Sequence, residues 1–493
     1  MRRLQVSSLL VVALVVLAGC AAPFAEGPPP AGEQTGEGEG GAEQVDANGD
    51  GSGASGFDFA DPSQDRLGWE AGYWHNESID VNQSDGLSDA EMDAFVGRSM
   101  ARVEYIRGLE FDSEVPVEVI ARSEYRNGSS EVPTPAEDDF AAWNNQVWEA
   151  LFIAGEDTNV QQALSDTQSS SVVGFYAPGD DEIKIITETP EEPVLRNATL
   201  IHELVHAIQD QRFDLTDERY RGATQDGDLA IDGLVEGDAN YVEDRYVQRC
   251  SSGEWECVPT PTQGGGSDGP APNLGILLTV FQPYSDGPVY VSSLREEGGW
   301  DRVNDAFDSP PASTEQIIHV TDEEPVPIEF RDRARNGWEL YPDQGVDGSD
   351  TVGEASIFAM FWAQARSGAD TINPRGLFET DSPYDTYNYA AEPSAGWAND
   401  RVFPYHKGSG PSAGYGYVWV TEWDTEEDAR EFLDAYRAIL RAQGGSQQAS
   451  NSNVWVVSEG PYEDAFRVTR SGTRVVIVNA PTAEDLDDVR PRG

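Results

Sequence analysis

The chain has 493 residues, enough for two or three domains, and 38% of them are hydrophobic, which suffices for buried cores. Its 89 acidic and 32 basic residues give a formal net charge of −57. No basic block is present that could neutralise a run of phosphates, so the composition excludes nucleic acid as an expected partner. The self-repulsion of such a charge would be relieved in molar salt, where the Debye length falls to roughly 3 Å.

The N-terminus is typical of an exported protein. Arg2 and Arg3 precede an apolar run from Leu9 to Leu17 that is too short to span a bilayer with these flanks. The run ends in Leu-Ala-Gly-Cys20, which is similar to a lipobox, so we expect residues 1–19 to be a signal peptide and Cys20 to carry a lipid. A cleaved signal peptide without a lipid is the alternative. We therefore predict a protein on the outer face of the cell membrane, anchored through Cys20.

The next segment, residues 20–57, is rich in Gly, Glu, Pro and Ala and lacks apolar periodicity, so we expect a flexible tether. Folded sequence is expected to begin near Asp58. Four sequons in the exported part are candidate glycosylation sites, although chance sequons are common. They are Asn76, Asn82, Asn127 and Asn197.

The following stretch mixes helical and strand patterns. Ser88 and Glu91 have capping-box spacing, which predicts a helix through about Arg107. A strand is expected over Val115 to Ile120 and a helix over Phe140 to Ile153. Two β-rich runs, residues 172–177 and 182–187, flank a Pro-Gly turn, and this predicts a hairpin.

Directly after the hairpin comes the motif His202-Glu203-Leu204-Val205-His206, inside an amphipathic helical pattern. Two histidines four positions apart project from one helical face and can reach the same metal ion. Glu203 lies roughly a quarter turn away, where it could hold and deprotonate a water molecule on the metal. The alternative is a helix whose histidines are satisfied by hydrogen bonds in the core or face solvent.

A catalytic zinc site needs a third protein ligand. We predict a second helix over Ile231 to Glu243 and choose Glu236 as this ligand, because it follows a Leu-Val pair and precedes Gly237, where two helices could cross closely. Three acidic residues on or near the same helix are substitutes, and each is otherwise an ordinary surface carboxylate. They are Asp232, Asp238 and Glu243.

This arrangement resembles the Glu-zincin metallopeptidases, which pair a His-Glu-x-x-His helix with a glutamate on a following helix. The resemblance implies that His202, His206 and Glu236 bind Zn²⁺ and that Glu203 is the general base, with a peptide or protein as substrate. It also implies that an antiparallel edge strand before the metal helix pairs with the extended peptide. One departure is that Glu236 follows His206 by thirty positions, a longer interval than in the best-known members.

Over nearly its whole folded length the chain is also similar to a family of haloarchaeal surface lipoproteins. The similarity includes Gly174-Phe175-Tyr176, the stretch from His202 to His206, and the stretch from Ser313 to His319. Only Lys184 and Lys407 are lysines, and low lysine with high acid resembles the proteins of extreme halophiles. The function of that family is assigned from such motifs alone.

Two features follow the metal-site helices. Cys250 and Cys257 are the only cysteines besides Cys20, so we predict a local disulfide in the exported protein. His319 is a candidate donor for stabilising the oxyanion of a tetrahedral intermediate, in competition with a structural role and with Tyr241 and Tyr246.

The C-terminal part reads as a second α+β unit. Strands are expected over Tyr415 to Trp423, Val454 to Ser458, Ala465 to Arg470 and Thr473 to Asn479, with a helix over Glu426 to Gln443. The Gly-x-Ser-x-Gly run at 410–414 leads into a strand rather than a helix, so we do not interpret it as a nucleophile elbow.

The predicted fold class is therefore α+β. A zincin-like domain over 58–330 is followed by a smaller α+β domain over 331–493. The expected function is a lipid-anchored zinc metallopeptidase that hydrolyses peptide bonds through a zinc-bound water, with Glu203 as base. The alternative is a non-catalytic cell-envelope lipoprotein that keeps a zincin-like fold for binding or structure.

Overall fold

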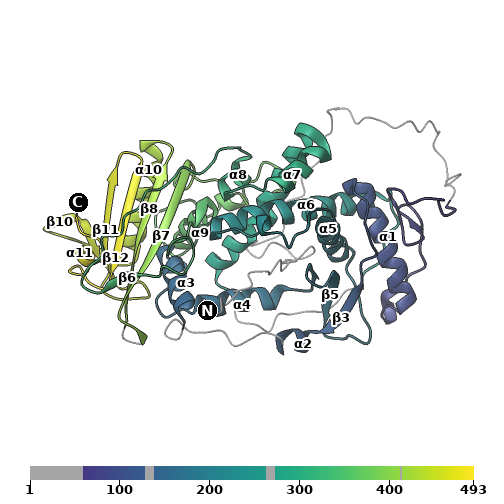
Figure 1. The fold of residues 1–493 in the computed structure, drawn as a ribbon, viewed down its shortest axis with the longest axis horizontal. Helices are drawn as coiled ribbons and strands as arrows, with labels where there is room; N and C mark the ends of the chain where they lie inside the picture. Colours follow the sequence, from purple (N-terminus) through teal and green to yellow (C-terminus); the bar gives the residue numbers. More distant parts are fainter. Residues whose placement is uncertain (1–58, 128–137, 262–271, 411–412, 493) are drawn as a thin grey trace.

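The computed structural model describes residues 59–127, 138–261, 272–410 and 413–492. The predicted signal peptide, Cys20 and the 20–57 tether lie outside these ranges. Helices and sheets are both abundant, which confirms the α+β class. The molecule is elongated, with a large sheet at one end, a small sheet and a long helix at the other, and further helices between them (Figure 1). Within the described ranges, no helix is both long and apolar enough to cross a bilayer.

The small sheet has three strands in the order β3-β5-β4, with β5 parallel to β3 and antiparallel to β4. The predicted hairpin is thus confirmed, and β4 is the edge strand. Helix α1, whose capping box at Ser88 and Glu91 is formed as expected, packs against α5 and against the short hairpin of β1 and β2. The elements of this part are β1 (Trp69–Glu70), β2 (Tyr73–Trp74), η1 (Gln83–Asp85), α1 (Asp89–Arg107), β3 (Val117–Ala121), α2 (Arg122–Asn127), α3 (Asp139–Ala150), α4 (Val160–Ser171), β4 (Gly174–Ala177) and β5 (Glu182–Thr187).

The middle of the molecule is helical (Figure 1). Its helices α6 and α7 cross so closely that a Cβ added to Gly237 would lie 2.4 Å from the carbonyl carbon of Gly287. This confirms the expectation that Gly237 marks a close helix crossing. The elements here are α5 (Asn197–Phe213), η2 (Glu218–Tyr220), α6 (Gln225–Ser252), α7 (Leu274–Asp308) and α8 (Thr314–His319).

The C-terminal sheet has seven strands in the order β6-β7-β8-β12-β11-β10-β9, and all neighbours are antiparallel. The strands and the helix expected there are confirmed, within a few residues at their ends. The elements are β6 (Trp338–Leu340), α9 (Gly353–Arg366), η3 (Gly376–Phe378), β7 (Trp397–Lys407), β8 (Gly414–Trp423), α10 (Glu426–Ala442), β9 (Ser446–Gln448), β10 (Asn451–Val456), β11 (Ala465–Ser471), β12 (Arg474–Ala480) and α11 (Leu486–Val489).

One face of this sheet carries the largest hydrophobic core. That core joins α10 and α9 to the sheet, and it also takes in Trp148 of α3 and Phe281 of α7. Residues that precede the C-terminal sheet in the sequence, from α3 and α7, therefore complete its core. A second core is built from α1, α5, α6 and the small sheet, and it buries α5.

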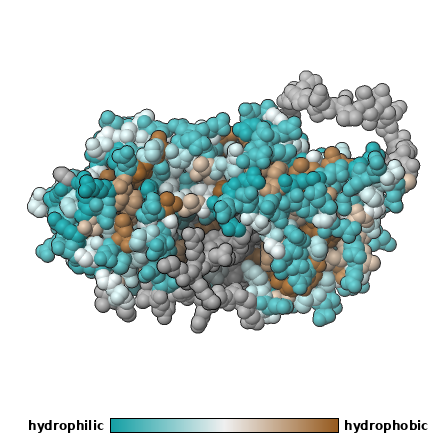
Figure 2. All heavy atoms as spheres, viewed as in Figure 1, coloured by the Kyte–Doolittle hydropathy of each residue, from teal (hydrophilic) through white to brown (hydrophobic). Residues whose placement is uncertain are grey.

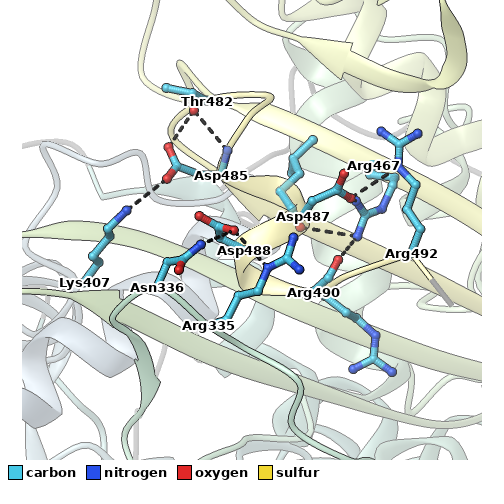
Figure 3. Close-up of polar contacts among 11 residues, drawn as sticks. Arg335, Asn336, Lys407, Arg467, Thr482, Asp485, Asp487, Asp488, Arg490 and Arg492 are labelled. Carbon is cyan, nitrogen blue, oxygen red and sulfur yellow. Dashed lines mark hydrogen bonds and ion pairs between the residues drawn. The ribbon is translucent and has the colours of Figure 1, made fainter.

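The opposite face of the large sheet is closed by the C-terminal segment (Figure 3). Arg467 of β11 is almost buried and bonds both the Asp487 carboxylate and the Arg490 carbonyl. Asp488 accepts hydrogen bonds from Arg335 and Asn336. The outer surface of the molecule is largely hydrophilic in the face shown in Figure 2, as the net charge requires.

Candidate metal centre

Helix α5 is buried along most of its length, from Thr199 to Asp210. Leu200, Leu204 and Ile208 are fully buried and pack into the core shared with α1 and the small sheet. With this face fixed by hydrophobic burial, the polar residues between them turn toward α6 and toward β4. Burial of these apolar residues fixes the orientation of α5, and this orientation places its polar residues in the interior as well.

His202, His206 and Glu236 form one cluster, with one donor atom from each residue lying within 4.8 Å of the others. His202 Nε2 is 3.0 Å from Glu236 Oε2, and His206 Nε2 is 3.3 Å from the same oxygen. All three residues are buried, at 1%, 0% and 3% exposure. The two helices therefore bring together the three residues that the sequence selected as ligands.

A chain of buried polar groups orients His206. Its Nδ1 is 2.9 Å from Gln209 Oε1, while the Gln209 amide nitrogen donates to the Val235 carbonyl and to Asp238 Oδ2. Because Gln209 uses its nitrogen elsewhere, its oxygen accepts, and His206 must carry its proton on Nδ1. This leaves Nε2 as the free donor of an electron pair, as a metal ligand requires. Asp238 is held in turn by Arg107 at 2.8 Å.

The support behind His202 is weaker, because its Nδ1 lies near a carboxylate but forms no hydrogen bond among the described residues. Its Nδ1 lies 3.3 Å from Glu243 Oε2, two turns beyond Glu236 on α6. A proton on Nδ1 would face this carboxylate and leave Nε2 directed at Glu236. Two of the three substitute ligands thus contact other residues and are not in the cluster. Asp238 pairs with Arg107 and Glu243 lies behind His202, while Asp232 is outside the cluster.

Glu203 is fully buried and faces the edge strand β4. Its Oε2 accepts a hydrogen bond of 2.8 Å from the backbone N–H of Tyr176, and its Oε1 has no partner among the described residues. Since this N–H bonds Glu203, it takes no part in the ladder between β4 and β5, so the free edge of β4 faces α5. Tyr176 also donates from its hydroxyl to Asp210, 2.9 Å away, which ties β4 to α5 a second time.

The charges of the cluster are strongly coupled. Burial by itself disfavours the ionised form of Glu236, but the neighbouring His206 and His202 outweigh it and lower the Glu236 pKa to about 2. Burial likewise disfavours the charged form of His202, yet its contacts with Glu236 and Glu243 raise the His202 pKa well above the ordinary value. Burial raises the pKa of Glu203. The pocket is therefore built for a positive charge beside Glu236.

A divalent metal ion fits this donor set. Two imidazole nitrogens and one carboxylate oxygen are the ligands of a typical His₂Glu catalytic zinc site. His206 Nε2 is buried and has no hydrogen-bond partner among the described residues, although Glu236 lies close to it. A buried nitrogen without a hydrogen bond costs free energy unless another partner, such as a metal ion, takes its electron pair. The residues present therefore match the coordination needs of zinc.

The structure pairs the predicted oxyanion donor, His319, with Glu354. His319 Nε2 lies 3.0 Å from both oxygens of this carboxylate, and His319 is not part of the cluster around Glu236. The hydroxyl of Tyr241 accepts from Arg295, and that of Tyr246 donates to Asn197. All three side chains thus have structural partners.

The predicted Cys250–Cys257 disulfide is present. Among the sequons, Asn76 and Asn82 are exposed, and Asn127 lies at the end of α2. Asn197 begins α5 and its amide nitrogen donates to the Val258 carbonyl at 2.6 Å. A glycan on this nitrogen would have to break that bond.

Sequence reasoning missed the supporting groups, chiefly Gln209, Arg107 and the backbone N–H of Tyr176. Only Gln209 carries a local signal, since it follows His206 by three positions and lies on the same helical face. Arg107 comes from α1, 131 positions before Asp238, and only the tertiary fold brings the two together.

Residues 339–490 match a family described as a domain of unknown function (DUF8575). These residues cover the C-terminal sheet, α9 and α10 but not the metal centre. The comparisons found no match among curated proteins and none among solved structures.

Proposed function

We propose that this protein is a zinc-dependent metallopeptidase that hydrolyses peptide bonds with Glu203 as general base. The observation that carries the proposal is the convergence of His202, His206 and Glu236, with Glu203 on the same helix as the two histidines. A structural metal site needs no such fourth group. The unpartnered Oε1 of Glu203 is what a base that accepts a proton from water requires.

In this proposal each residue has a definite task. His202, His206 and Glu236 hold the ion, and Gln209 and Glu243 keep both imidazoles in the ligating tautomer. When bound, zinc would polarise the scissile carbonyl and make water acidic enough to lose a proton near neutral pH. Glu203, oriented by the Tyr176 N–H, accepts that proton on Oε1 and delivers it to the leaving amine.

The substrate is proposed to be an extended peptide that runs along β4. This strand is the edge of the small sheet, and its outward backbone groups lie next to Glu203. Backbone hydrogen bonds at a sheet edge do not distinguish the side chains of the substrate. Specificity for a peptide sequence would therefore come from the surface on either side of β4. Location on the outer face of the membrane, with a lipid on Cys20, is part of the same proposal and rests on the lipobox-like sequence.

A second candidate is a closed, non-catalytic zinc site in a cell-envelope lipoprotein. The near-complete burial of the four residues favours it, because a substrate must reach a catalytic metal. The unused Glu203 oxygen favours the peptidase instead.

The deciding experiment compares the exported chain, residues 21–493, with its Glu203→Gln and His206→Ala variants in molar salt. We would measure bound zinc by elemental analysis and cleavage of a broad peptide library. If the protein is a peptidase, the wild type binds one zinc per chain and cleaves peptides. Glu203→Gln should bind the same amount of zinc but cleave no peptide, because it lacks the base. His206→Ala should lose both zinc and cleavage. Zinc without cleavage of any peptide would support the closed site, and a wild type without zinc would contradict both candidates.

A further inference from the structure

A second group of acidic side chains lies away from the zinc-site residues. Glu315 of α8, Glu323 in the loop after it and Asp424 at the end of β8 place one carboxylate oxygen each within 4.8 Å of the others. Glu315 is only 4% exposed, whereas Glu323 and Asp424 are exposed. The group is thus a partly exposed site in which Glu315 forms the buried side, here called the buried wall.

The buried member has an unusual environment. Glu315 Oε2 is inaccessible to water and has no hydrogen-bond partner among the described residues. Its charged neighbours are mostly acidic, namely Glu354, Asp424 and Glu323, with His319 as the one cation. His319 is already bonded to both oxygens of Glu354. Burying an ionised carboxylate without a hydrogen bond or a cation is costly, so this arrangement calls for a partner.

The backbone around the three carboxylates is held firmly. Thr314, next to Glu315, donates from its N–H and its hydroxyl to Asp226, and its hydroxyl accepts from the Ala355 N–H. The Glu323 carbonyl accepts from Gln316, and the Asp424 N–H donates to Gly396. The carboxylates are therefore brought together by the fold and not by chance contact of flexible side chains.

The ligand chemistry selects the kind of ion. Three carboxylates from separate segments offer only hard oxygen donors, which suit Ca²⁺ or Mg²⁺ and not the softer ions that prefer nitrogen or sulfur. Of these two ions, Ca²⁺ accepts the irregular geometry of a partly exposed site, whereas Mg²⁺ requires a near-ideal octahedron. In the other acidic group, formed by Glu149, Glu156 and Asp464, the buried Asp464 already accepts a hydrogen bond from Asn479. The group at Glu315 is the one that lacks such compensation.

We propose that Glu315, Glu323 and Asp424 bind a calcium ion that joins α8 to the end of strand β8. The ion would neutralise the buried Glu315 carboxylate and link the helical middle of the molecule to the C-terminal sheet. Burial and the acidic neighbours raise the Glu315 pKa to about 8, so protons compete with the ion below that pH. Because α8 packs on α6 through Ile317 and Gly233, the link reaches the helix that carries Glu236.

The test uses the full-length protein at pH 8 in molar NaCl, dialysed free of divalent ions, and measures the melting temperature with and without millimolar Ca²⁺. The expected result is a rise of roughly 3 °C for the wild type and none for Glu315→Gln or Glu323→Gln. Glu324→Gln is the matched control, since it removes an exposed charge one position from Glu323, and it should keep the rise.

Equilibrium dialysis with radioactive calcium independently measures the number of calcium ions bound per chain. We expect Glu323→Gln to bind one ion fewer than Glu324→Gln. Glu323 is exposed, so this pair of variants tests the site without disturbing the buried wall. The proposal is overturned if Ca²⁺ leaves the wild type unchanged, as protonation of Glu315 alone would predict. It is also overturned if both glutamine variants keep the full calcium response, as binding to the general negative surface would predict.

Discussion

Gln209 Oε1 lies 2.9 Å from His206 Nδ1, at the start of a buried chain that continues through Asp238 to Arg107. Each step fixes the donor and acceptor roles of the next, since Arg107 only donates and Asp238 only accepts. The proton position on the proposed zinc ligand His206 is therefore set by the Asp238 carboxylate through Gln209, and Arg107 of α1 compensates the buried charge of Asp238. This relationship makes zinc affinity sensitive to residues that do not touch the metal.

The first prediction concerns Gln209. Replacing it with leucine removes the acceptor that holds the His206 proton on Nδ1, so zinc affinity should fall by about 10- to 100-fold. Competition with a chromogenic chelator measures this directly. Gln211→Leu, on the same helix but bonded to Ser113 and Asp112 outside the cluster, is the control and should keep wild-type affinity. Unchanged affinity in Gln209→Leu would show that the hydrogen bond does not orient the ligand.

The second prediction concerns the crossing of α6 and α7. A Cβ at Gly237 would lie 2.4 Å from the carbonyl carbon and 2.5 Å from the oxygen of Gly287, and both are backbone atoms that cannot move aside alone. Gly237→Ala should therefore lower the free energy of unfolding by roughly 1–3 kcal/mol or more, as overpacked cores do. Urea denaturation in molar salt measures it. Gly179→Ala, where nothing lies within 4 Å, should have little effect.

The elements found in advance share a strong local pattern. Helix α10 alternates apolar and charged residues with helical period, and the strands β8, β11 and β12 are rich in β-branched and aromatic residues. Helix α9 was not predicted, because Ile357 to Trp362 is apolar on every side and buried throughout, so no amphipathic period exists. Helix α7 also lacks a clear local signal, because it contains Pro283 and Pro288, and proline usually interrupts a helix.

The candidate metal centre was likewise predictable only where a local sequence pattern marks its residues. The His-Glu-x-x-His spacing places two candidate ligands and the candidate base by helical geometry, and Glu236 was selected through the Leu-Val pair before it and the glycine after it. The supporting contacts were not predictable, since Glu243 reaches His202, and Arg107 reaches Asp238, only through the packing of α1, α5 and α6. Likewise, His319 offers no local sign that Glu354 lies against it.

The third prediction is a dependence of stability on pH. Glu104 of α1 is buried, and desolvation raises its pKa to about 8, despite hydrogen bonds from the Phe111 and Gly68 N–H groups. The folded state thus holds a proton that the unfolded chain releases near the ordinary value of about 4.5. The stability from this proton is complete below about pH 4.5 and is lost as the pH rises to about 8.

Glu104→Gln removes this titration and should flatten the fall of the unfolding free energy between about pH 4.5 and 8. The exposed Asp93 on the same helix provides a control, and Asp93→Asn should leave the slope unchanged. The measurement is urea denaturation at several pH values at constant salt. An identical slope in the wild type and Glu104→Gln would contradict the prediction.

The fourth prediction concerns the ion pair of Arg107 and Asp238, whose side chains are both completely buried. Arg107→Met leaves the Asp238 charge in the interior with only Gln209 beside it, so the unfolding free energy should fall by roughly 3–5 kcal/mol. Adding Asp238→Asn removes that charge and should recover a large part of the loss, which a double-mutant cycle quantifies. Additive losses would mean that the pair is not coupled.

The same cycle tests whether the pair acts on the metal. Asp238 accepts from the Gln209 amide, and this bond directs the Gln209 oxygen toward His206. In Asp238→Asn alone, the amide can be reoriented, and Gln209 loses a charged acceptor, so zinc affinity should fall along with stability. Arg107→Met keeps the charged acceptor, so its loss should appear in stability and much less in zinc affinity. Equal losses of zinc affinity in both variants would indicate general loosening of α5 and α6 instead of control through Gln209.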